Sequence, residues 1–428
     1  MSTFHITGGT KLYGEIDVAG SKNTALAIMS AVVLADGVTV LHNVPDVSDT
    51  RIKARLLERF GAKVEWQEGS LFVDCSNIIA GQADEETVRA IRTSFYLLGP
   101  LLARVGKVTM PAPGGCKIGA RPVDFHVKGL ALLGAEVELD GGVYRAKTPK
   151  LRGAEIYLDF PSAGATQHLM ATATLAEGMT VIQNAAVEPE VVSLADFLIR
   201  MGARIEGHGT STITIIGVKS LEPCVYRIPA DRLQAGTYLL AGAITRGEVK
   251  VKGIMPDHQT ALVNKLREAG ADIQEGADWV SVGAVGRMKG IKVKTMPYPG
   301  FATDIQQPMA ALLSVAEGTS VVEETIYESR SGHVQELNRM GANIHMAERS
   351  AFITGVESLK GAVVEASDLR AGAALTLAGL AAEGDTIVKN IHFIDRGYQA
   401  FEENLRSLGA RIERVESDVS TGEPSLGT

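Results

Sequence analysis

Hydrophobic residues along the chain follow two spacings, one typical of helices and one typical of strands. The segment 194–201 (LADFLIRM) has apolar residues at i, i+3, i+4 and i+7, which predicts a helix with one apolar face. The segment 64–73 (VEWQEGSLFV) alternates around a glycine turn, which predicts two short antiparallel strands. The segment 25–35 (ALAIMSAVVLA) is apolar nearly all round, as in a helix buried on every side. The pattern therefore predicts an α/β protein.

These segments recur in a fixed order. One sequence phrase occurs about every 70 residues and consists of an apolar helix end, then Gly-Ala, any residue, and Val or Ile. Its glycines are Gly61, Gly134, Gly202, Gly270, Gly341 and Gly409. A second phrase, an apolar segment closing on a glycine before a β-rich stretch, runs in step with the first, at Gly37, Gly106, Gly178, Gly247, Gly318 and Gly384. Glycine can take the left-handed conformation that ends a helix. We interpret the chain as six helix-and-strand units around shared helices, since one unit cannot cover its sheet alone.

The buried helices of these units carry charges where they begin. Counting back 14 or 15 residues from the closing glycines reaches Lys22, Arg92, Arg232, Asp304 and Arg370. Cations at a helix N-terminus oppose the helix dipole, which favours anions there. Four cations in phase favour one shared anion site. Solvation at a loop edge is the alternative for each residue taken alone.

Carboxylates occupy the same helix starts, at Asp231, Asp304 and Asp368. An acid that points into an anion site is tolerated when it transfers a proton. Each of these aspartates is also a suitable helix N-cap, and for Asp368 the two interpretations have equal weight.

Composition excludes several classes of protein. The net charge of −8 argues against a general nucleic-acid binder, which needs a basic face. The N-terminus lacks a secretory signal, and the longest apolar run is too short to span a bilayer. Three widely spaced cysteines make neither a disulfide framework nor a zinc site. We therefore expect a cytoplasmic protein without membrane insertion.

One cysteine lies in a loop that favours reactivity. Cys116 belongs to PAPGGCKIGARP, residues 111–122, and the neighbouring Lys117 and Arg121 would lower its pKa. An incidental loop cysteine is the equally weighted alternative from the loop alone. Cys75 and Cys224 lie in strand-like segments and are assigned to packing.

Several motifs together resemble one enzyme family. PGGCKIGARPVD, AGSKN, IRTS, FPSAGAT, FATDIQQP, YESR, DLRAGAAL and IDRGY are similar to those of the UDP-N-acetylglucosamine 1-carboxyvinyltransferases, from about residue 4 to about residue 414. The resemblance implies a two-domain inverse α/β barrel built from six repeats, three per domain. Domain 1 would span residues 22–230 and carry the Cys116 loop. Domain 2 would combine residues 1–21 with residues 231–428, with the active site between the domains.

The resemblance also implies a reaction. The family transfers the enolpyruvyl group of phosphoenolpyruvate to the 3-hydroxyl of UDP-N-acetylglucosamine, releasing phosphate, in the first committed step of peptidoglycan synthesis. Cys116 would be the general acid, Asp304 the base toward the sugar hydroxyl, and Lys22 and Arg396 the other catalytic residues. No metal or organic cofactor is expected, because cations supply the electrostatic stabilisation.

The implied substrate contacts fall into two groups. Phosphoenolpyruvate would be bound by Lys22, Arg121 and Arg396, with Arg330 and Arg370 supporting the site. The other substrate-binding residues, which include those for the nucleotide sugar and its diphosphate, would be Asn23, Arg92, Arg121, Pro122, Val123, Asp124, Ser162, Gly164, Asp304, Ile326, Glu328 and Asp368.

The sequence departs from the family's pattern at a few positions. Lys117 replaces a small residue, Ser331 and Gly332 replace bulky ones, and His168 replaces asparagine. A second, slower or regulatory copy of the enzyme is therefore an open alternative. So are 3-phosphoshikimate 1-carboxyvinyltransferase, which lacks the loop cysteine, and a non-catalytic sensor of UDP-sugars.

Overall fold

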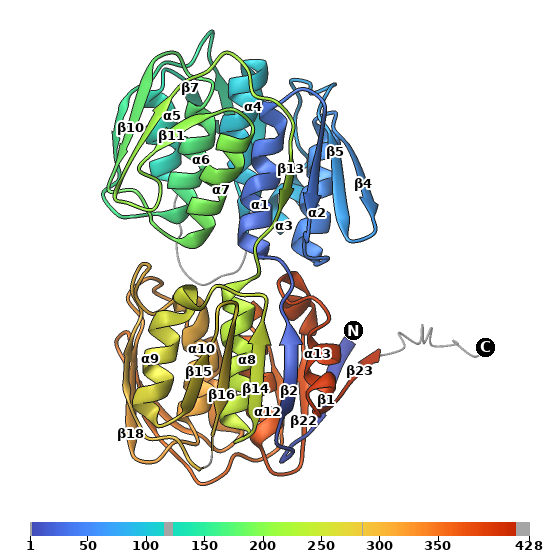
Figure 1. The fold of residues 1–428 in the computed structure, drawn as a ribbon, viewed down its shortest axis with the longest axis vertical. Helices are drawn as coiled ribbons and strands as arrows, with labels where there is room; N and C mark the ends of the chain where they lie inside the picture. The colour runs from blue at the N-terminus through green and yellow to red at the C-terminus, as the bar shows by residue number, and fades with distance from the viewer. Residues whose placement is uncertain (1, 115–122, 285, 417–428) are drawn as a thin grey trace, which may run out of the picture.

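A computed structural model describes residues 2–114, 123–284 and 286–416. These residues fold into two α/β lobes stacked along the long axis of the molecule, with the first and last described strands both in the lower lobe (Figure 1). Across the described residues there are six small sheets, each built from three or four strands. No helix in the described ranges has the length and apolar character needed to cross a membrane.

The upper lobe is made of three consecutive helix-and-strand units. The first contains α1 (Lys22–Ala31), η1 (Val32–Leu34), β3 (Val38–His42), α2 (Ser48–Arg59), β4 (Lys63–Gln67) and β5 (Ser70–Asp74). The second contains α3 (Glu85–Ala90), η2 (Arg92–Leu97), α4 (Leu98–Val105), β6 (Lys107–Pro111), α5 (Asp124–Leu132), β7 (Glu136–Asp140) and β8 (Val143–Lys147). The third contains β9 (Glu155–Tyr157), α6 (Ala163–Ala173), β10 (Met179–Gln183), α7 (Pro189–Arg200), β11 (Arg204–Glu206) and β12 (Thr212–Ile216).

The lower lobe repeats the arrangement. Its first unit contains α8 (Arg232–Ile244), β14 (Glu248–Lys252), η3 (Pro256–Gln259), α9 (Thr260–Ala269), β15 (Asp272–Glu275) and β16 (Trp279–Gly283). The second contains β17 (Lys292–Lys294), η4 (Thr303–Ile305), α10 (Gln306–Leu313), β18 (Thr319–Glu323), α11 (Gly332–Arg339), β19 (Asn343–Ala347) and β20 (Ser350–Thr354). The third contains β21 (Val363–Glu365), α12 (Leu369–Ala381), β22 (Asp385–Lys389), η5 (Ile391–Arg396), α13 (Phe401–Ser407) and β23 (Arg411–Glu416).

Three strands complete sheets that lie far away in sequence. β1 (Ser2–Thr7) pairs with β22 and β23, and β2 (Tyr13–Asp17) pairs with β14, so the start of the chain belongs to the lower lobe. β13 (Val225–Arg227) pairs with β3, so this later segment belongs to the upper lobe. In the four-stranded sheets one edge strand is parallel to its neighbour and the other pairings are antiparallel, as in β17-β18-β20-β19.

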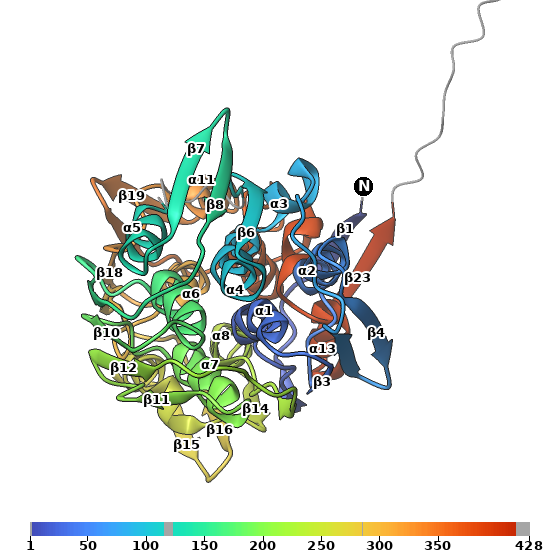
Figure 2. The same cartoon turned by 90° about the horizontal axis from the view of Figure 1, so that it is seen from above.

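The central helices of each lobe are buried nearly all round, as their apolar sequences predicted. In the lower lobe α8, α10 and α12 contact one another, and almost all their side chains are inaccessible to solvent. In the upper lobe α1, α4 and α6 take the same central place while the strands lie toward the outside (Figure 2). Two separate hydrophobic clusters result. One draws on residues 25–228 and the other on residues 4–18 and 233–412.

The repeated glycines end helices as the sequence predicted. All six glycines of the Gly-Ala phrase have φ between +89° and +104°. Gly247, in the second phrase, is an exception, because its φ is not positive. A Cβ there would lie 1.9 Å from the backbone oxygen of Leu12, so close backbone packing explains this glycine.

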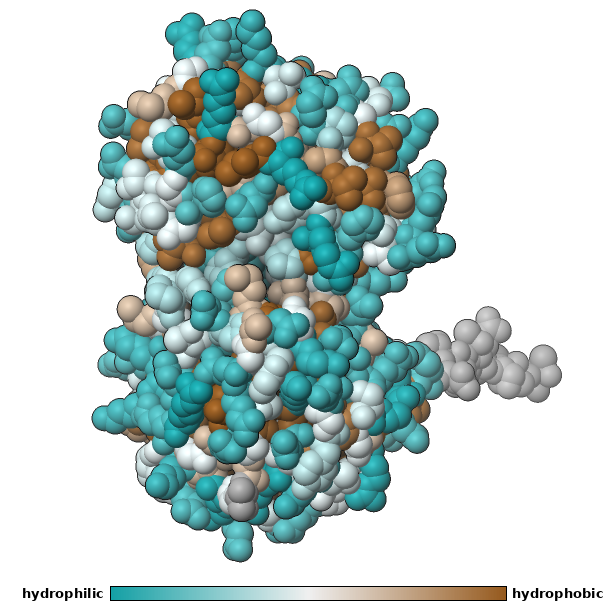
Figure 3. All heavy atoms as spheres, viewed as in Figure 1, coloured by the Kyte–Doolittle hydropathy of each residue, from teal (hydrophilic) through white to brown (hydrophobic). Residues whose placement is uncertain are grey.

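The chain crosses between the lobes twice, and the two crossings touch. Gly20 and Ala230 form an isolated antiparallel bridge. The Ser21 N–H donates to the Pro229 carbonyl at 2.7 Å, and the Asp231 N–H donates to the Ala19 carbonyl at 2.9 Å. The molecule is visibly narrower at this level in Figure 3. A paired two-strand connection therefore joins two otherwise separate hydrophobic cores.

Candidate active site

A cleft between the lobes has a volume of about 460 Å³. That size falls in the range of ordinary small-molecule sites. Its walls come from both lobes, and charged and aromatic side chains line much of it.

The structure gathers every predicted site residue that it describes around this one cleft. The lining includes Lys22, Asn23, Arg92, Val123, Asp124, Ser162, Gly164, Asp304, Ile326, Glu328, Arg330, Asp368, Arg370 and Arg396. Cys116, Arg121 and Pro122 lie outside the described residues. Cations that are more than 300 positions apart in the chain therefore share one cavity.

The cations reach the cleft because they lie at the first residues of helices, at the positions that the sequence repeat predicted. Lys22 begins α1, Arg92 begins η2 and Arg232 begins α8, while Arg370 is the second residue of α12. Because these helices run through the centres of both lobes, their N-termini meet at the cleft (Figure 1). The arrangement concentrates positive charge and helix N–H groups in one place.

Asp304 is held by two arginines. Arg330 Nη2 lies 2.6 Å from Asp304 Oδ1, and Arg370 Nη2 lies 3.4 Å from Oδ2. Burial alone would raise the pKa of Asp304, but Arg330 and Arg370 outweigh it and hold this pKa well below its usual value. In this arrangement Asp304 is a weak base, so a base role requires a change in its pairing.

Asp231 and Asp368 act as helix caps, the alternative that the sequence left open. Asp231 accepts from the Leu233 and Gln234 N–H groups at 2.8 and 3.0 Å. Asp368 accepts from the Arg370 and Ala371 N–H groups at 2.9 and 3.1 Å. Asp304 differs, because it lies inside the 3-10 helix η4 and caps nothing there.

Asp49 is a cleft residue that the sequence analysis missed. Its carboxylate accepts from Arg396 Nε at 2.9 Å, across the lobes, and from Lys22 Nζ at 3.3 Å. The side chain of Asp49 is only 5% exposed. An acid in the first turn of α2 is ordinary helix-dipole chemistry, so no signal in the sequence indicated that it would bridge two cations.

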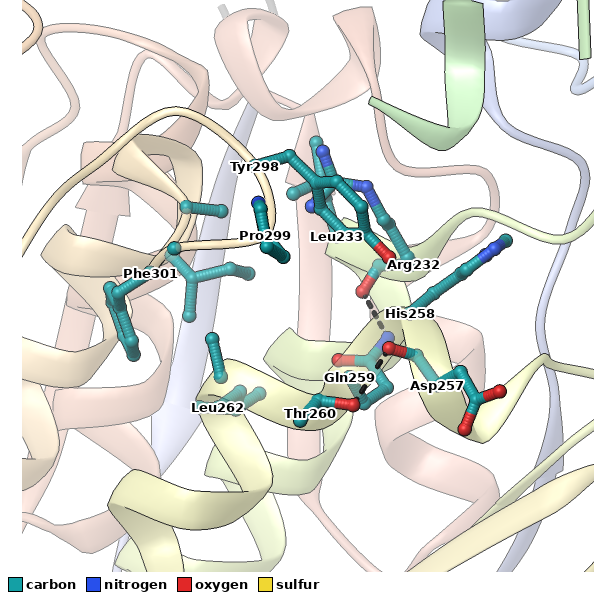
Figure 4. A pocket seen from close by; sticks show the side chains of 14 residues that line it. Arg232, Leu233, Asp257, His258, Gln259, Thr260, Leu262, Tyr298, Pro299 and Phe301 are labelled. Carbon is teal, nitrogen blue, oxygen red and sulfur yellow. Dashed lines mark hydrogen bonds between the residues drawn. The ribbon is translucent and has the colours of Figure 1, made fainter. Parts of the chain in front are cut away.

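A second ion pair joins the lobes within the cleft lining. Arg232 donates to Glu190 through Nε at 2.9 Å and Nη2 at 3.2 Å. The Arg232 guanidinium also lies 5.4 Å from the centre of the Tyr298 ring. Beside it is a smaller pocket of about 190 Å³, where the Gln259 side chain donates to the Arg232 carbonyl at 2.6 Å (Figure 4).

The two-lobed α/β fold matches solved structures of enolpyruvyl transferases. The enolpyruvyl transferase NikO of Streptomyces tendae has the same fold, with a TM-score of 0.88, 25% identity and coverage of 97% of this chain and 99% of its own. An EPSP synthase of Acinetobacter baumannii matches over 97% of this chain and 100% of its own, with a TM-score of 0.75 at 20% identity.

Sequence comparison narrows the class to one family. The family model for EPSP synthase (3-phosphoshikimate 1-carboxyvinyltransferase) matches residues 6–405. A UDP-N-acetylglucosamine 1-carboxyvinyltransferase of Carboxydothermus hydrogenoformans is 50% identical over 97% of this chain and 100% of its own, and one of Clostridium botulinum is 47% identical over the same shares. The chain belongs to the UDP-N-acetylglucosamine 1-carboxyvinyltransferase family.

Proposed function

We propose that the protein transfers the enolpyruvyl group of phosphoenolpyruvate to the 3-hydroxyl of UDP-N-acetylglucosamine and releases phosphate. The observation that carries the proposal is the convergence of Lys22, Arg370 and Arg396 from two lobes on one cleft. Such a group of cations suits a substrate with both a phosphate and a carboxylate. The names of relatives about half identical over nearly the whole chain supply the acceptor.

The proposed chemistry is an addition followed by an elimination. The sugar O3 attacks C2 of phosphoenolpyruvate while its proton passes to a base, for which we propose Asp304. A proton from the proposed acid Cys116 reaches C3, which gives a tetrahedral ketal. In the second step a proton leaves the C3 methyl group and the bond from C2 to the phosphate oxygen breaks. The cations stabilise the negative charge on the phosphate and carboxylate throughout.

Two carboxylates that line the cleft, those of Asp49 and Asp304, must change partners for this chemistry. Asp49 accepts from Lys22 and Arg396, the cations proposed for phosphoenolpyruvate. The substrate anions would take over these contacts and those that Arg330 and Arg370 make with Asp304. Loss of the arginine contacts would raise the pKa of Asp304 toward the range of a useful base.

The start of α6 is proposed to hold the diphosphate of the nucleotide sugar. Ser162 caps this helix by accepting from the Ala165 N–H at 3.3 Å. Gly164 lies against Tyr96, whose hydroxyl would be 2.4 Å from a Cβ at that position. A glycine here lets backbone and aromatic ring pack closely beside a helix N-terminus, which is a favourable place for phosphate.

We further infer how the chain divides into domains around this site. The lobes are proposed to be the two domains of an inverse α/β barrel with three repeats each, divided at residues 21/22 and 230/231. Separate hydrophobic clusters on either side of these positions support the division. The proposed place of action is the cytoplasm, in peptidoglycan synthesis, as the acceptor implies.

A phosphate-release assay tests the proposal directly. Phosphoenolpyruvate is supplied with either UDP-N-acetylglucosamine or shikimate 3-phosphate, and we expect phosphate only with the first. Release only with the second would show that the chain is a 3-phosphoshikimate 1-carboxyvinyltransferase. Tight binding of UDP-N-acetylglucosamine without any release would instead support a non-catalytic sensor.

A further inference from the structure

Two buried histidines meet at the wall of the cleft, and the proposed mechanism uses neither. His126 lies on α5 and His168 on α6, and their Nδ1 atoms are 3.0 Å apart. His168 Nε2 also accepts from the backbone N–H of Gly99, at 2.8 Å. His126 is 6% exposed and His168 is 1% exposed.

These contacts determine which nitrogen of each ring carries a proton. Burial lowers the pKa of His126 to about 3 and the pKa of His168 well below its usual value, so both rings are neutral. A neutral imidazole has one N–H and one acceptor nitrogen. Because His168 Nε2 accepts from Gly99, its proton is on Nδ1 and is donated to His126 Nδ1. The proton of His126 must therefore be on Nε2.

Gly99 allows this chain of hydrogen bonds to form. A Cβ at residue 99 would lie 2.6 Å from His168 Nε2 and 1.9 Å from the Thr172 hydroxyl. Only a residue without a side chain lets the α4 backbone approach α6 this closely. The tautomer of His168 is thus set by the packing of two central helices.

The remaining nitrogen of His126 is accessible from the cleft, since it is not among the buried side-chain atoms without a partner in the described ranges. His126 lines the cleft, and within the described ranges the bond to His168 is the one hydrogen bond of its side chain. Its ring centre is 5.7 Å from that of Tyr96, the residue that packs against Gly164 at the start of α6. A donor that lines the cleft and has no protein acceptor in the described ranges is available to an acceptor oxygen of a bound ligand.

We propose that His126 donates its Nε2–H to an acceptor oxygen in the uridine diphosphate part of the substrate, and that His168 is the positioning residue that fixes this tautomer. The inference rests on the proposed function for the identity of the ligand. The acceptor is either a diphosphate oxygen or a uracil carbonyl, and both are strong hydrogen-bond acceptors.

The wild-type protein provides the first test. Nitrogen-15 NMR of the labelled full chain should show His126 protonated on Nε2 and His168 on Nδ1. Addition of UDP should shift the His126 Nε2–H signal, and uridine alone should reproduce the shift only if the uracil is the acceptor. A His126 protonated on Nδ1, or a signal that UDP leaves unmoved, would overturn the proposal.

A matched pair of variants provides the second test. In His168→Asn the side-chain amide can replace the Nδ1–H donor, whereas in His168→Leu no donor remains. The Kd of UDP, measured by calorimetry, should rise about three- to tenfold in His168→Leu, as expected for one lost hydrogen bond, and stay within about twofold in His168→Asn. The KM of phosphoenolpyruvate should be unchanged in both variants.

The outcomes separate this inference from the proposed function. Equal UDP affinity in the two variants would show that His168 does not act through its donor. If His168→Leu fails to fold, the tautomers of the wild type and of His168→Asn still decide the question. A protein that binds UDP through His126 but releases no phosphate would contradict the proposed function and leave the present inference standing.

Discussion

At the scale of single residues, the cleft holds more internal ion pairing than its sequence indicated. Asp49 joins Lys22 of its own lobe to Arg396 of the other, and Asp304 joins Arg330 to Arg370. Partly buried cations are stable only when they have counter-charges. The carboxylates of Asp49 and Asp304 therefore supply the negative charge that a substrate anion is proposed to supply when it binds.

Replacing Asp49 with a neutral residue tests whether its carboxylate balances the charge of Lys22 and Arg396. Asp49→Asn leaves Lys22 and Arg396 with less counter-charge, so the free energy of unfolding should fall by about 1–3 kcal/mol. Inorganic phosphate should then raise Tm more in the variant than in the wild type. Asp46→Asn is the control, because the Asp46–Arg51 pair is exposed and should contribute less than about 1 kcal/mol. Equal phosphate responses would contradict the interpretation.

The cysteines should differ sharply in reactivity toward an epoxide of the fosfomycin type. Burial raises the pKa of Cys75 to about 12 and also raises the pKa of Cys224, so neither forms a thiolate readily near pH 7. Peptide mass spectrometry is expected to find the adduct on Cys116. An adduct on either of the other two would contradict the assignment of Cys116 as the reactive thiol.

The histidine pair should also be visible in the pH dependence of stability. The unfolded chain takes up protons at His126 and His168 below about pH 6.5, whereas the folded protein takes up few until its lower pKa values are reached. The free energy of unfolding should therefore fall as pH decreases below about 6.5, by up to about 1.4 kcal/mol per pH unit for each histidine.

Urea titrations between pH 4 and 8 measure this slope. His168→Asn should make it shallower, because one of the three buried histidines, His126, His168 and His333, is gone. His345→Asn serves as the control, because His345 is exposed on β19 whereas His168 is buried. The same slope in wild type and His168→Asn would count against a neutral His168.

At the scale of elements, the sequence predicted where helices begin and end better than it predicted the roles of the residues at their N-termini. The Gly-Ala phrases marked helix C-termini because a left-handed residue is a local requirement of the backbone. The function of a helix N-terminus is not local in the same way. Asp368 caps α12 whereas Asp304 faces two arginines, although both occupy similar places in their units.

Replacing one of the helix-ending glycines tests the requirement for a left-handed backbone conformation at the end of a helix. Gly270 has φ of +100°, and no atom lies within 4 Å of the place that a Cβ would take, so Gly270→Ala should destabilise through backbone strain alone, by about 1–2 kcal/mol. Gly283→Ala is the control, because the nearest atom to a Cβ there, Asp272 Cβ at 3.8 Å, is at ordinary contact distance and the φ of Gly283 is not positive. Urea denaturation should show a change below about 0.5 kcal/mol for the control.

At the scale of the whole molecule, two lobes with separate cores meet across a cleft and are joined by two adjacent crossings. Gly20 lies at one crossing, and a Cβ there would be 1.9 Å from the Asn43 backbone oxygen. The inter-lobe ion pairs Asp49–Arg396 and Glu190–Arg232 lie in the lining of the cleft. A ligand that contacts both walls would therefore bias the relative position of the lobes.

We expect the molecule to become more compact when the nucleotide sugar binds. Small-angle scattering should show a smaller radius of gyration with saturating UDP-N-acetylglucosamine than without it. Glu190→Gln, which weakens one inter-lobe pair, should increase the radius of the free protein and leave that of the complex nearly unchanged. An identical radius with and without ligand would show that the cleft does not close.

The sequence by itself determined the elements and the kind of chemistry. Hydrophobic spacing fixes which face of a helix or strand is buried, and glycine fixes where helices end, because both depend on neighbours within a few residues. The recurrence of these signals about every 70 residues was therefore enough to predict six units and to locate the cations at their helix starts.

Only the tertiary structure decided how those charges pair. Asp49 meets Arg396 and Arg232 meets Glu190 across the cleft, and His126 meets His168 inside one lobe, with no sequence spacing that indicates any of these contacts. Such pairs depend on how whole units pack and on where the chain crosses between the lobes. Local periodicity carries no information on that packing, because the same pattern is satisfied whichever buried surface a unit meets.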